Sequence, residues 1–282
     1  MDFLVNKDVL IVMHKHRSFL KWPGNKYRVL EHICARLPAG QRLIEPFVGS
    51  AAVFLNTQYP KYLLSDVNAD LIHVYKLLQS EGQHFINYVK SFFKSKNNAP
   101  EKYYKFREKF NSTEDLRLKA ALFIYLNRHG YNGLCRYNRS GFFNVPFGRY
   151  RQPYFPEAEM QFFYQKSQQN VTFMCADFRT CLKKARRGHV VYCDPPYVPL
   201  SASANFTAYS CEPFLVAQQD HLVGTAEQLA GKGIPVLVSN HDTKDVRNAY
   251  QNAKLFYFSV SRTISCNPNR RLPAPELLAL FE

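Results

Sequence analysis

The chain has 282 residues, and 37 Lys and Arg residues against 22 Asp and Glu residues give it a formal net charge of +15. This length suits one large α/β domain with an insertion, or two modest domains. An enzyme of small metabolites has no need of such an excess of positive charge, whereas a protein that binds a polyanion does, so nucleic acid is the favoured partner.

Membrane, secreted and metal-binding classes are disfavoured. The apolar run 9–13 is too short for a signal peptide or a membrane span. The seven cysteines are odd in number and form no C-x-x-C pair, and none has a histidine at metal-site spacing. We therefore expect reduced thiols in a cytosolic protein, with no metal.

The first informative segment follows a leader, residues 1–18, to which we assign no task. It contains a lone Trp22, a glycine turn and Lys26, and an amphipathic helix is predicted over 27–37. A lysine at a helix start can bind an anion or a carboxylate. The alternative is a core tryptophan followed by a turn.

Residues 42–54 read as a strand, a tight turn and a helix, which is the first βα unit of a doubly wound sheet. In such sheets ligands bind beyond the carboxyl ends of the strands, and Gly49 allows close approach of the backbone to a ligand. A single glycine followed by Ser50 is not a G-x-G-x-x-G motif. The turn therefore favours a smaller adenosyl ligand over a dinucleotide.

A second strand is predicted over 62–68 and contains Asp66 near its end. An acidic residue at about this distance beyond a glycine turn accepts hydrogen bonds from ribose hydroxyls. The alternative is that Asp66 caps the next helix. Four helical segments follow, at 71–78, 85–93, 103–110 and 116–126.

Residues 127–150 have the composition of a nucleic-acid-binding segment. Four arginines alternate with aromatic residues and asparagines, a hairpin turn is predicted at 139–141, and almost nothing apolar is left over to build a core. Arginine can bind guanine O6 and N7, asparagine and tyrosine can hold phosphates, and an aromatic ring can wedge into a base stack. The alternative is a solvated hairpin.

The remaining elements complete the predicted sheet. A strand over 171–178 carries Asp177 and Phe178 at its end, either as ligand contacts or as a helix cap and a core residue. A strand over 235–242 ends near His241, where a strand-end cap is favoured over a general base. Strands are also predicted at 189–193, 254–261 and 276–282, with helices at 179–187 and 215–230.

The strand 189–193 leads directly into Asp194, Pro195, Pro196 and Tyr197. The prolines fix the backbone and remove two N–H donors, so the neighbouring carbonyls are left as acceptors. Together with the Asp194 carboxylate they could accept both hydrogens of a planar amino group. Tyr197 offers a flat face for a ring. This turn is therefore a pocket for an aromatic amine.

The D-P-P-Y turn, with residues 191–193 before it and 205–209 after it, resembles the Dam-type adenine branch of the DNA amino-methyltransferases. The resemblance implies methyl transfer from S-adenosyl-L-methionine to N6 of adenine in duplex DNA, within GATC, by base flipping. It also implies a monomer in the cytoplasm of a bacterium or a phage-infected host, associated with the nucleoid, with no membrane and no metal.

The fold implied is α/β, with a Rossmann-like sheet of the S-adenosylmethionine-dependent methyltransferases and helices on both faces. Residues 19–80 and 170–282 would form the catalytic domain that binds the cofactor. Residues 81–169 would form a smaller DNA-recognition domain with a β-hairpin over 131–148.

The resemblance also assigns residues to roles. The catalytic residues would be Asp194, Pro195, Pro196 and Tyr197. The cofactor would be held by Trp22, Lys26, Glu45, Pro46, Phe47, Gly49, Ser50, Asp66, Asp177, Phe178 and Asp194. In the DNA, Lys21 and Arg136 would each contact a guanine, and Leu134 and Pro146 would contact a thymine methyl. Tyr131 and Asn132 would fill or brace the gap left by the target base. Asn138 and Arg149 would hold phosphates.

Pro23, Asn25 and Ala51 depart from the family pattern, which has smaller residues or glycines there. They keep open a catalytically silent DNA-binding module. A methyltransferase of RNA or of a protein glutamine is a second alternative. The proposed chemistry would be contradicted by an Asp194 carboxylate that is salt-bridged inward with no cavity between it and Gly49.

Overall fold

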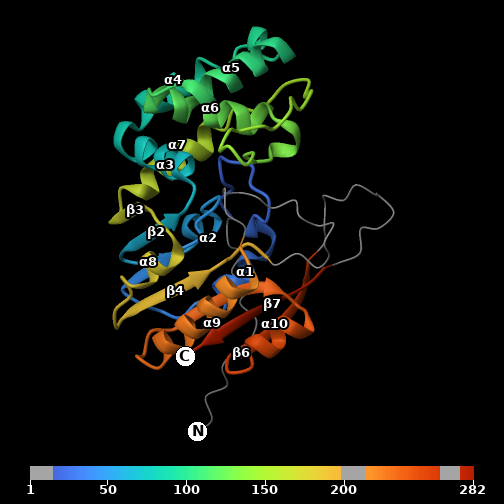
Figure 1. Cartoon of the computed structure of the whole chain (residues 1–282). Coiled ribbons are helices and arrows are strands. Elements are labelled where there is room, and N and C mark those ends of the chain that lie inside the picture. Colours follow the sequence, from blue (N-terminus) through green and yellow to red (C-terminus); the bar gives the residue numbers. More distant parts are fainter. Residues whose placement is uncertain (1–14, 198–213, 261–273) are drawn as a thin grey trace.

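The computed structural model describes residues 15–197, 214–260 and 274–282 (Figure 1). The motif at 205–209 and residues 1–14 of the leader lie outside the described residues. The last residues of the leader are packed onto the fold: Lys15 pairs with Glu31 at 2.7 Å, and the His16 ring stacks on Phe162 at 3.6 Å between centroids.

A seven-stranded sheet in the order β3-β2-β1-β4-β5-β7-β6 forms the centre of the molecule. β7 runs antiparallel to both of its neighbours, β5 and β6, and the pairs among β1 to β5 are parallel. The strands are β1 (Arg42–Glu45), β2 (Tyr62–Asp66), β3 (Val171–Cys175), β4 (His189–Cys193), β5 (Val236–His241), β6 (Lys254–Val260) and β7 (Ala274–Phe281). The predicted doubly wound sheet is confirmed.

The strand order reverses beside β1, which pairs with β2 on one side and with β4 on the other. Ligands of open α/β sheets bind in the crevice at such a switch point, beyond the carboxyl ends of the strands. Glu45 at the end of β1 and Asp194 after β4 therefore lie at the same edge of the sheet.

Helices cover both faces of the sheet, as predicted, because successive strand residues point to opposite sides. Val191 packs in a cluster with α8 (Phe178–Leu182), α9 (Val216–Ala230) and α10 (Lys244–Ala249). Val190 packs in the other cluster, which η1 (Lys26–Val29), α1 (Leu30–Cys34), α2 (Ala52–Leu55) and α3 (Ala69–Glu81) cover.

The helical lobe lies at one end of the molecule in Figure 1 and consists of α4 (Gln83–Lys90), η2 (Ser95–Asn97), α5 (Pro100–Ser112), α6 (Leu116–His129), η3 (Tyr131–Gly133) and α7 (Glu157–Ser167). The Asp115 side chain accepts hydrogen bonds from the first turn of α6, and that helix is buried from Ala120 to its end. The predicted helices of this region are confirmed. α7 and α10 were not predicted.

The 127–150 segment differs from the prediction in two ways. It forms no ladder: the hairpin is reduced to two isolated bridges, Gly130 with Phe147 and Tyr137 with Phe143. It also contributes to the core, because Phe143 and Val145 are buried. The neighbouring helix α5 binds the outer edge of this segment: the Asn111 side chain donates to the Phe143 carbonyl and accepts from the Phe143 N–H.

Candidate active site and DNA-recognition surface

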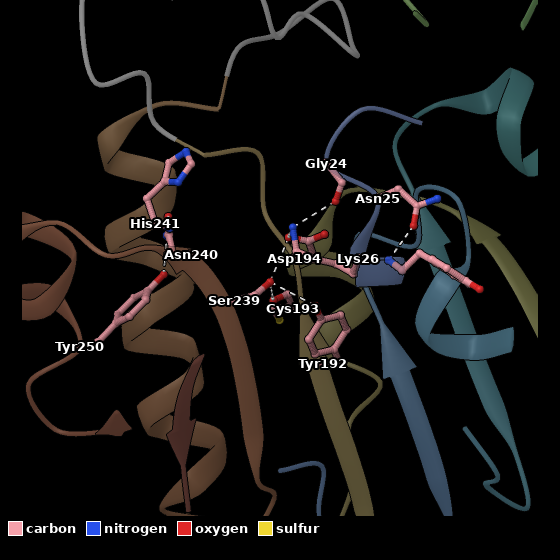
Figure 2. Close-up of polar contacts among 11 residues, drawn as sticks. Gly24, Asn25, Lys26, Tyr192, Cys193, Asp194, Ser239, Asn240, His241 and Tyr250 are labelled. Carbon is pink, nitrogen blue, oxygen red and sulfur yellow. Dashed lines mark hydrogen bonds and ion pairs between the residues drawn. The ribbon is translucent and has the colours of Figure 1, made fainter. Parts of the chain in front are cut away.

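The Asp194 carboxylate follows the last residue of β4 and is held on one oxygen (Figure 2). Lys26 Nζ lies 2.9 Å from Asp194 Oδ1, and Ser239 Oγ donates to the same atom at 2.9 Å. Lys26 also donates to the Gly24 carbonyl at 3.1 Å, and Tyr192 shares a hydrogen bond with Ser239. Three separate parts of the chain therefore fix the carboxylate.

The charges of this pair depend on each other. Burial raises the pKa of the Asp194 carboxyl, and the Lys26 ammonium and the Ser239 hydroxyl hold that rise back. Burial acts to lower the pKa of Lys26, but the facing charges, Asp194 first among them, outweigh it and raise the pKa above its ordinary value. We conclude that Lys26 stays charged and that the two groups form an ion pair.

This ion pair meets the first half of the condition that would contradict an amino-group pocket. It occupies Oδ1 only, and the Asp194 side chain keeps 21% of its surface exposed. Among the described residues no hydrogen bond reaches the Pro195 carbonyl. One carboxylate oxygen and that carbonyl therefore remain as the two acceptors that an amino group needs.

Tyr197 packs between two side chains of the site. Lys26 Nζ lies 4.7 Å from the centroid of its ring, and the His241 ring meets it edge-on at 4.2 Å. Lysine over an aromatic face is a favourable electrostatic contact. The sequence favoured a strand-end cap for His241, and the structure places its ring against the D-P-P-Y turn.

The glycine bend after β1 is built around Asp66. Gly49 has φ +44°, and its N–H donates to Asp66 Oδ2 at 3.0 Å. The other carboxylate oxygen accepts from Asn68 N at 3.0 Å. Asp66 therefore holds the bend in place, and whether it also accepts from a ribose stays a prediction, since each oxygen has a second lone pair.

The residues at the bend fit an adenosyl ligand with an amino group. A Cβ on Gly49 would lie 3.0 Å from Trp22 Nε1, so only glycine leaves this backbone open. Glu45 is 2% exposed, and its Oε1 has no hydrogen-bond partner in the described part of the chain. Burial, and then Asp194, raise the pKa of Glu45 to about 8. A buried carboxyl oxygen without a partner suits a ligand that brings a polar group to it.

Two departures from the family pattern are accommodated locally. Ala51 takes the left-handed conformation, at φ 60° and ψ 25°, that a glycine would take before α2. Asn25 caps η1, since its side-chain oxygen accepts from Tyr27 N at 2.8 Å. Pro23 lines a neighbouring cavity. The altered residues thus preserve the bend and the helix start.

At the end of β3 both predicted residues have structural roles, and their contact with the cofactor stays a prediction. Asp177 caps α8 and pairs with Arg179 at 2.6 Å, which lowers the pKa of Asp177 against the opposing effect of burial. Phe178 is 2% exposed and stacks on Phe47 at 5.4 Å. Phe47 is the more exposed of the two rings. Pro46 and Ser50 are buried beside the bend.

Arg136 and Lys21 are each held by a different asparagine, and neither asparagine was predicted as a site residue. Arg136 Nε donates to Asn144 Oδ1 at 2.8 Å and its Nη2 to the Asn144 carbonyl at 3.3 Å, which leaves Nη1 and one hydrogen of Nη2 for a partner. Asn127 is buried and clamps the Lys21 backbone, accepting from its N–H at 2.9 Å and donating to its carbonyl at 2.7 Å. The Lys21 ammonium lies 4.1 Å from the Tyr150 ring centroid.

The other predicted DNA contacts fall into two groups. Tyr131, Asn132, Pro146 and Arg149 are exposed. Leu134 is half-buried against the core, and the Asn138 side-chain oxygen accepts from Ser140 N and Phe142 N, so it also shapes the turn. A cavity of about 340 Å³ beside these residues is lined by Lys21, Trp22, Arg128 and Asn132 among others, and does not border Asp194.

Within residues 15–197, 214–260 and 274–282, no three or more His, Cys, Asp or Glu side chains are grouped so that they could hold a metal ion. No helix in these ranges has the length and apolar character needed to cross a bilayer.

Ser239, Asn127 and Asn144 carry no local sequence signal. Ser239 is recognisable only once β5 is known to pair with β4, because Cys193 and Val238 are then partners in register. Asn127 near a helix end and Asn144 in a loop are polar residues of the kind found at many such positions. Their roles depend on what lies opposite them in the fold.

Comparison with known proteins shows the family of this chain. DNA adenine methylase of Escherichia coli (strain K12) is 50% identical over 270 residues, which cover 96% of this chain and 97% of that protein. DNA adenine methylase of Serratia marcescens is 50% identical, covering 95% and 100%, and that of Vibrio cholerae O395 is 48% identical, covering 95% and 97%. The family model of the D12 class matches residues 22–264. The chain belongs to the D12 class of N6 adenine-specific DNA methyltransferases.

Proposed function

We propose that this methyltransferase acts on the adenine of GATC in duplex DNA, as a monomer in the cytoplasm of a bacterium or a phage-infected host, at the nucleoid. The observation that carries the proposal is the placement of Asp194 beside the Pro195 carbonyl with one carboxylate oxygen left for a substrate. A monomer suffices, because Lys26, Ser239 and Asp194 all come from one chain.

The amino group of adenine is a poor nucleophile because its lone pair is delocalised into the ring. Donation of one N–H to Asp194 and the other to the Pro195 carbonyl localises that lone pair on nitrogen. S-adenosyl-L-methionine supplies a methyl group made electrophilic by its sulfonium sulfur. Holding the amino nitrogen in a near-attack position can supply about 7–11 kcal/mol of the barrier.

Asp194 need not be a strong base. The methylated nitrogen is cationic and acidic, so the second carboxylate oxygen can take its proton. Before the reaction, the Lys26 ammonium keeps the Asp194 carboxylate ionised, so that it is ready to accept this proton. Trp22, Glu45 and the Gly49 bend would hold the cofactor, with Phe47 the more accessible ring at the edge of that site.

The target base must leave the duplex to reach this turn, at a cost of a few kcal/mol for unstacking. Stacking on Tyr197 recovers about 1–3 kcal/mol of that cost. Tyr131 and Asn132 are exposed at the start of the recognition segment and would fill the gap in the DNA. Arg136, held by Asn144, would read one guanine, and Lys21 the other.

GATC methylation is tested by digestion of DNA, incubated with enzyme and S-adenosyl-L-methionine, with nucleases that cut GATC according to its methylation state. Protection at GATC alone supports the proposal. We expect Asp194→Ala to abolish methylation and to keep duplex binding, whereas Asp242→Ala, another partly buried carboxylate that follows a strand, retains methylation. An Asp194→Ala enzyme with normal turnover would contradict the catalytic assignment.

Arg136→Ala should relax discrimination at one guanine of the site by about 1–3 kcal/mol. Asn144→Ala should relax it at the same position, because it frees the guanidinium that Asn144 orients. The measurement is kcat/KM on duplexes with each base of the site changed in turn. Uniform weakening on all sequences would instead identify Arg136 as a phosphate contact.

A further inference from the structure

Positive side chains gather at the edge of the sheet opposite the active site. Because the strands are parallel, the ends opposite Asp194 are the amino ends of β1, β2 and β4. Arg42 begins β1 and is the register partner of His189, the first residue of β4. Lys61 precedes β2, and its carbonyl accepts a hydrogen bond from Leu43 N. In Figure 1 the arrow of β4 points away from this edge.

The turns next to these strand ends add further cations. The Arg187 side chain donates to the Lys232 carbonyl at 3.3 Å, which joins the turn before β4 to the turn before β5. We call the whole group the amino-edge patch. It consists of Arg42, Lys61, Lys183, Lys184, Arg186, Arg187 and Lys232, and all but the half-buried Arg42 are exposed.

Negative charge is scarce around the patch. None of the ion pairs within the described residues includes any member of it. The stretches 178–193 and 228–241 contain no acidic residue. Glu227 bonds Asn252. Glu282 follows Phe281, which pairs with Val236 at the amino end of β5, so this one carboxylate lies at the margin of the patch beside the turn that carries Lys232. Burial, and then Arg42 and Arg186, lower the pKa of His189.

Such a surface lowers the stability of the fold, because Glu282 at its margin offsets only part of its seven positive charges. Like charges repel, and exposed cations without acidic neighbours destabilise a compact state. A solvated face could consist of mixed charges instead, as the helical lobe does with Lys90 and Glu157 or Arg117 and Glu81. An unbalanced cluster therefore indicates a partner of negative charge.

The partner cannot be the stretch of duplex bound at the active site. β4 has five residues, so the two edges of the sheet are separated by about 17 Å of strand and face in opposite directions. A straight duplex that reaches Asp194 and Arg136 does not reach Lys183. The patch spans the width of four neighbouring strands, which is on the order of 15 Å and suits a duplex backbone.

We propose that the amino-edge patch is a second DNA-binding surface, which holds the backbone of another duplex segment without regard to sequence while the recognition segment engages its site. The enzyme then bridges two segments of DNA, and its local concentration near further target sites rises. This inference goes beyond the proposed function and is independent of which sequence is methylated.

The test uses a variant with Lys61, Lys183, Lys184 and Lys232 changed to Gln, four exposed side chains with no bond to the rest of the described chain. The matched control changes Lys96, Lys102, Lys109 and Lys244 to Gln, which removes the same charge from exposed sites elsewhere. Each protein is first saturated with a short duplex that contains one target site. A labelled duplex without a target site is then added, and sedimentation measures whether it joins the complex.

We expect the wild type and the control to bind the second duplex and the patch variant to lose it. If each of the four lysines neutralises one phosphate, the salt slope of second-duplex binding falls by about 3.6 in the variant. Single-turnover methylation of the short duplex should be unchanged in the patch variant. Failure of the wild type to bind a second duplex, or equal binding by the patch variant, overturns the proposal and leaves the methylation assignment intact.

Discussion

The Asp194 carboxylate shows how one residue is prepared for its task by three neighbours. Lys26 and Ser239 both bind Oδ1, and Tyr192 orients Ser239 in turn. Fixing one oxygen fixes the rotation of the whole group, so the other oxygen is aimed before a substrate arrives. Ser239 acts through Asp194 and is therefore a positioning residue.

Ser239→Ala should lower the rate of methyl transfer by roughly 10- to 100-fold, because a hydrogen bond to a charged group contributes about 1.5–3 kcal/mol. Its bond to Asp194 also lowers the pKa of that carboxyl, so its loss raises that pKa further. The acidic limb of the pH–rate profile should then move to higher pH. Single-turnover rates across pH measure both effects.

Thr225→Val is the control for Ser239→Ala, since the Thr225 hydroxyl bonds the His221 carbonyl on the exposed side of α9. It should leave the rate and the pH profile unchanged. A Ser239→Ala enzyme whose profile coincides with the wild type would show that Ser239 packs beside Asp194 without orienting it.

At the scale of elements, the segment 19–26 joins DNA recognition to the catalytic turn. One end of it is clamped by Asn127 from α6, and the other carries Lys26 on Asp194. The recognition segment touches it directly, because a Cβ on Gly133 would lie 2.3 Å from the Lys21 Cβ. A displacement of the recognition segment must therefore move the segment that holds the carboxylate.

Gly133→Ala should destabilise the protein by about 2–5 kcal/mol, since it adds a steric clash to the cost of a left-handed conformation at φ +63°. The clash displaces Lys21, so discrimination between target and non-target duplexes should fall as well. Thermal unfolding and binding to both duplexes measure the two effects.

Gly233→Ala isolates the conformational cost. Gly233 has φ +73° with nothing within 4 Å of an added Cβ, so this variant should lose only about 1–2 kcal/mol and should keep its discrimination. If Gly133→Ala behaves like Gly233→Ala, Lys21 does not depend on this contact.

For the whole molecule, the helical lobe and the sheet share one core. A single hydrophobic cluster runs from Phe19 through Leu122 on α6 to Leu278 on β7. Tyr75 on α3 stacks on Phe163 of α7 at 4.8 Å within it. The division into a catalytic and a DNA-recognition domain at residues 80 and 170 remains a prediction, but the packing across it is that of one unit.

Denaturant unfolding should accordingly be a single transition. The lone tryptophan, Trp22, lies where the lobe meets the sheet, and its fluorescence reports that junction. The midpoint of the unfolding transition followed by Trp22 fluorescence should coincide with the midpoint followed by far-ultraviolet circular dichroism, which reports all helices. Two separated midpoints would show that the lobe unfolds independently of the sheet.

The sequence by itself determined the succession of most strands and helices along the chain, the Gly49 bend, the acids near the strand ends and the D-P-P-Y turn. These features depend on residues close together in the chain: periodicity, turn residues and short motifs. The long helices from Ala69 to His129 were predicted for the same reason. α10 has only six residues and was missed, as a helix of that length shows little periodicity.

Only the tertiary structure decided which side chains meet. Asn127 reaches Lys21 across 106 residues of chain, and Ser239 reaches Asp194 across 45. The predicted hairpin keeps only two bridges, side chains of α5 bind the backbone of its second arm, and its Phe143 and Val145 joined the core. Such contacts follow from strand order and helix packing, which arise from burial of the whole chain and leave no mark on neighbouring residues.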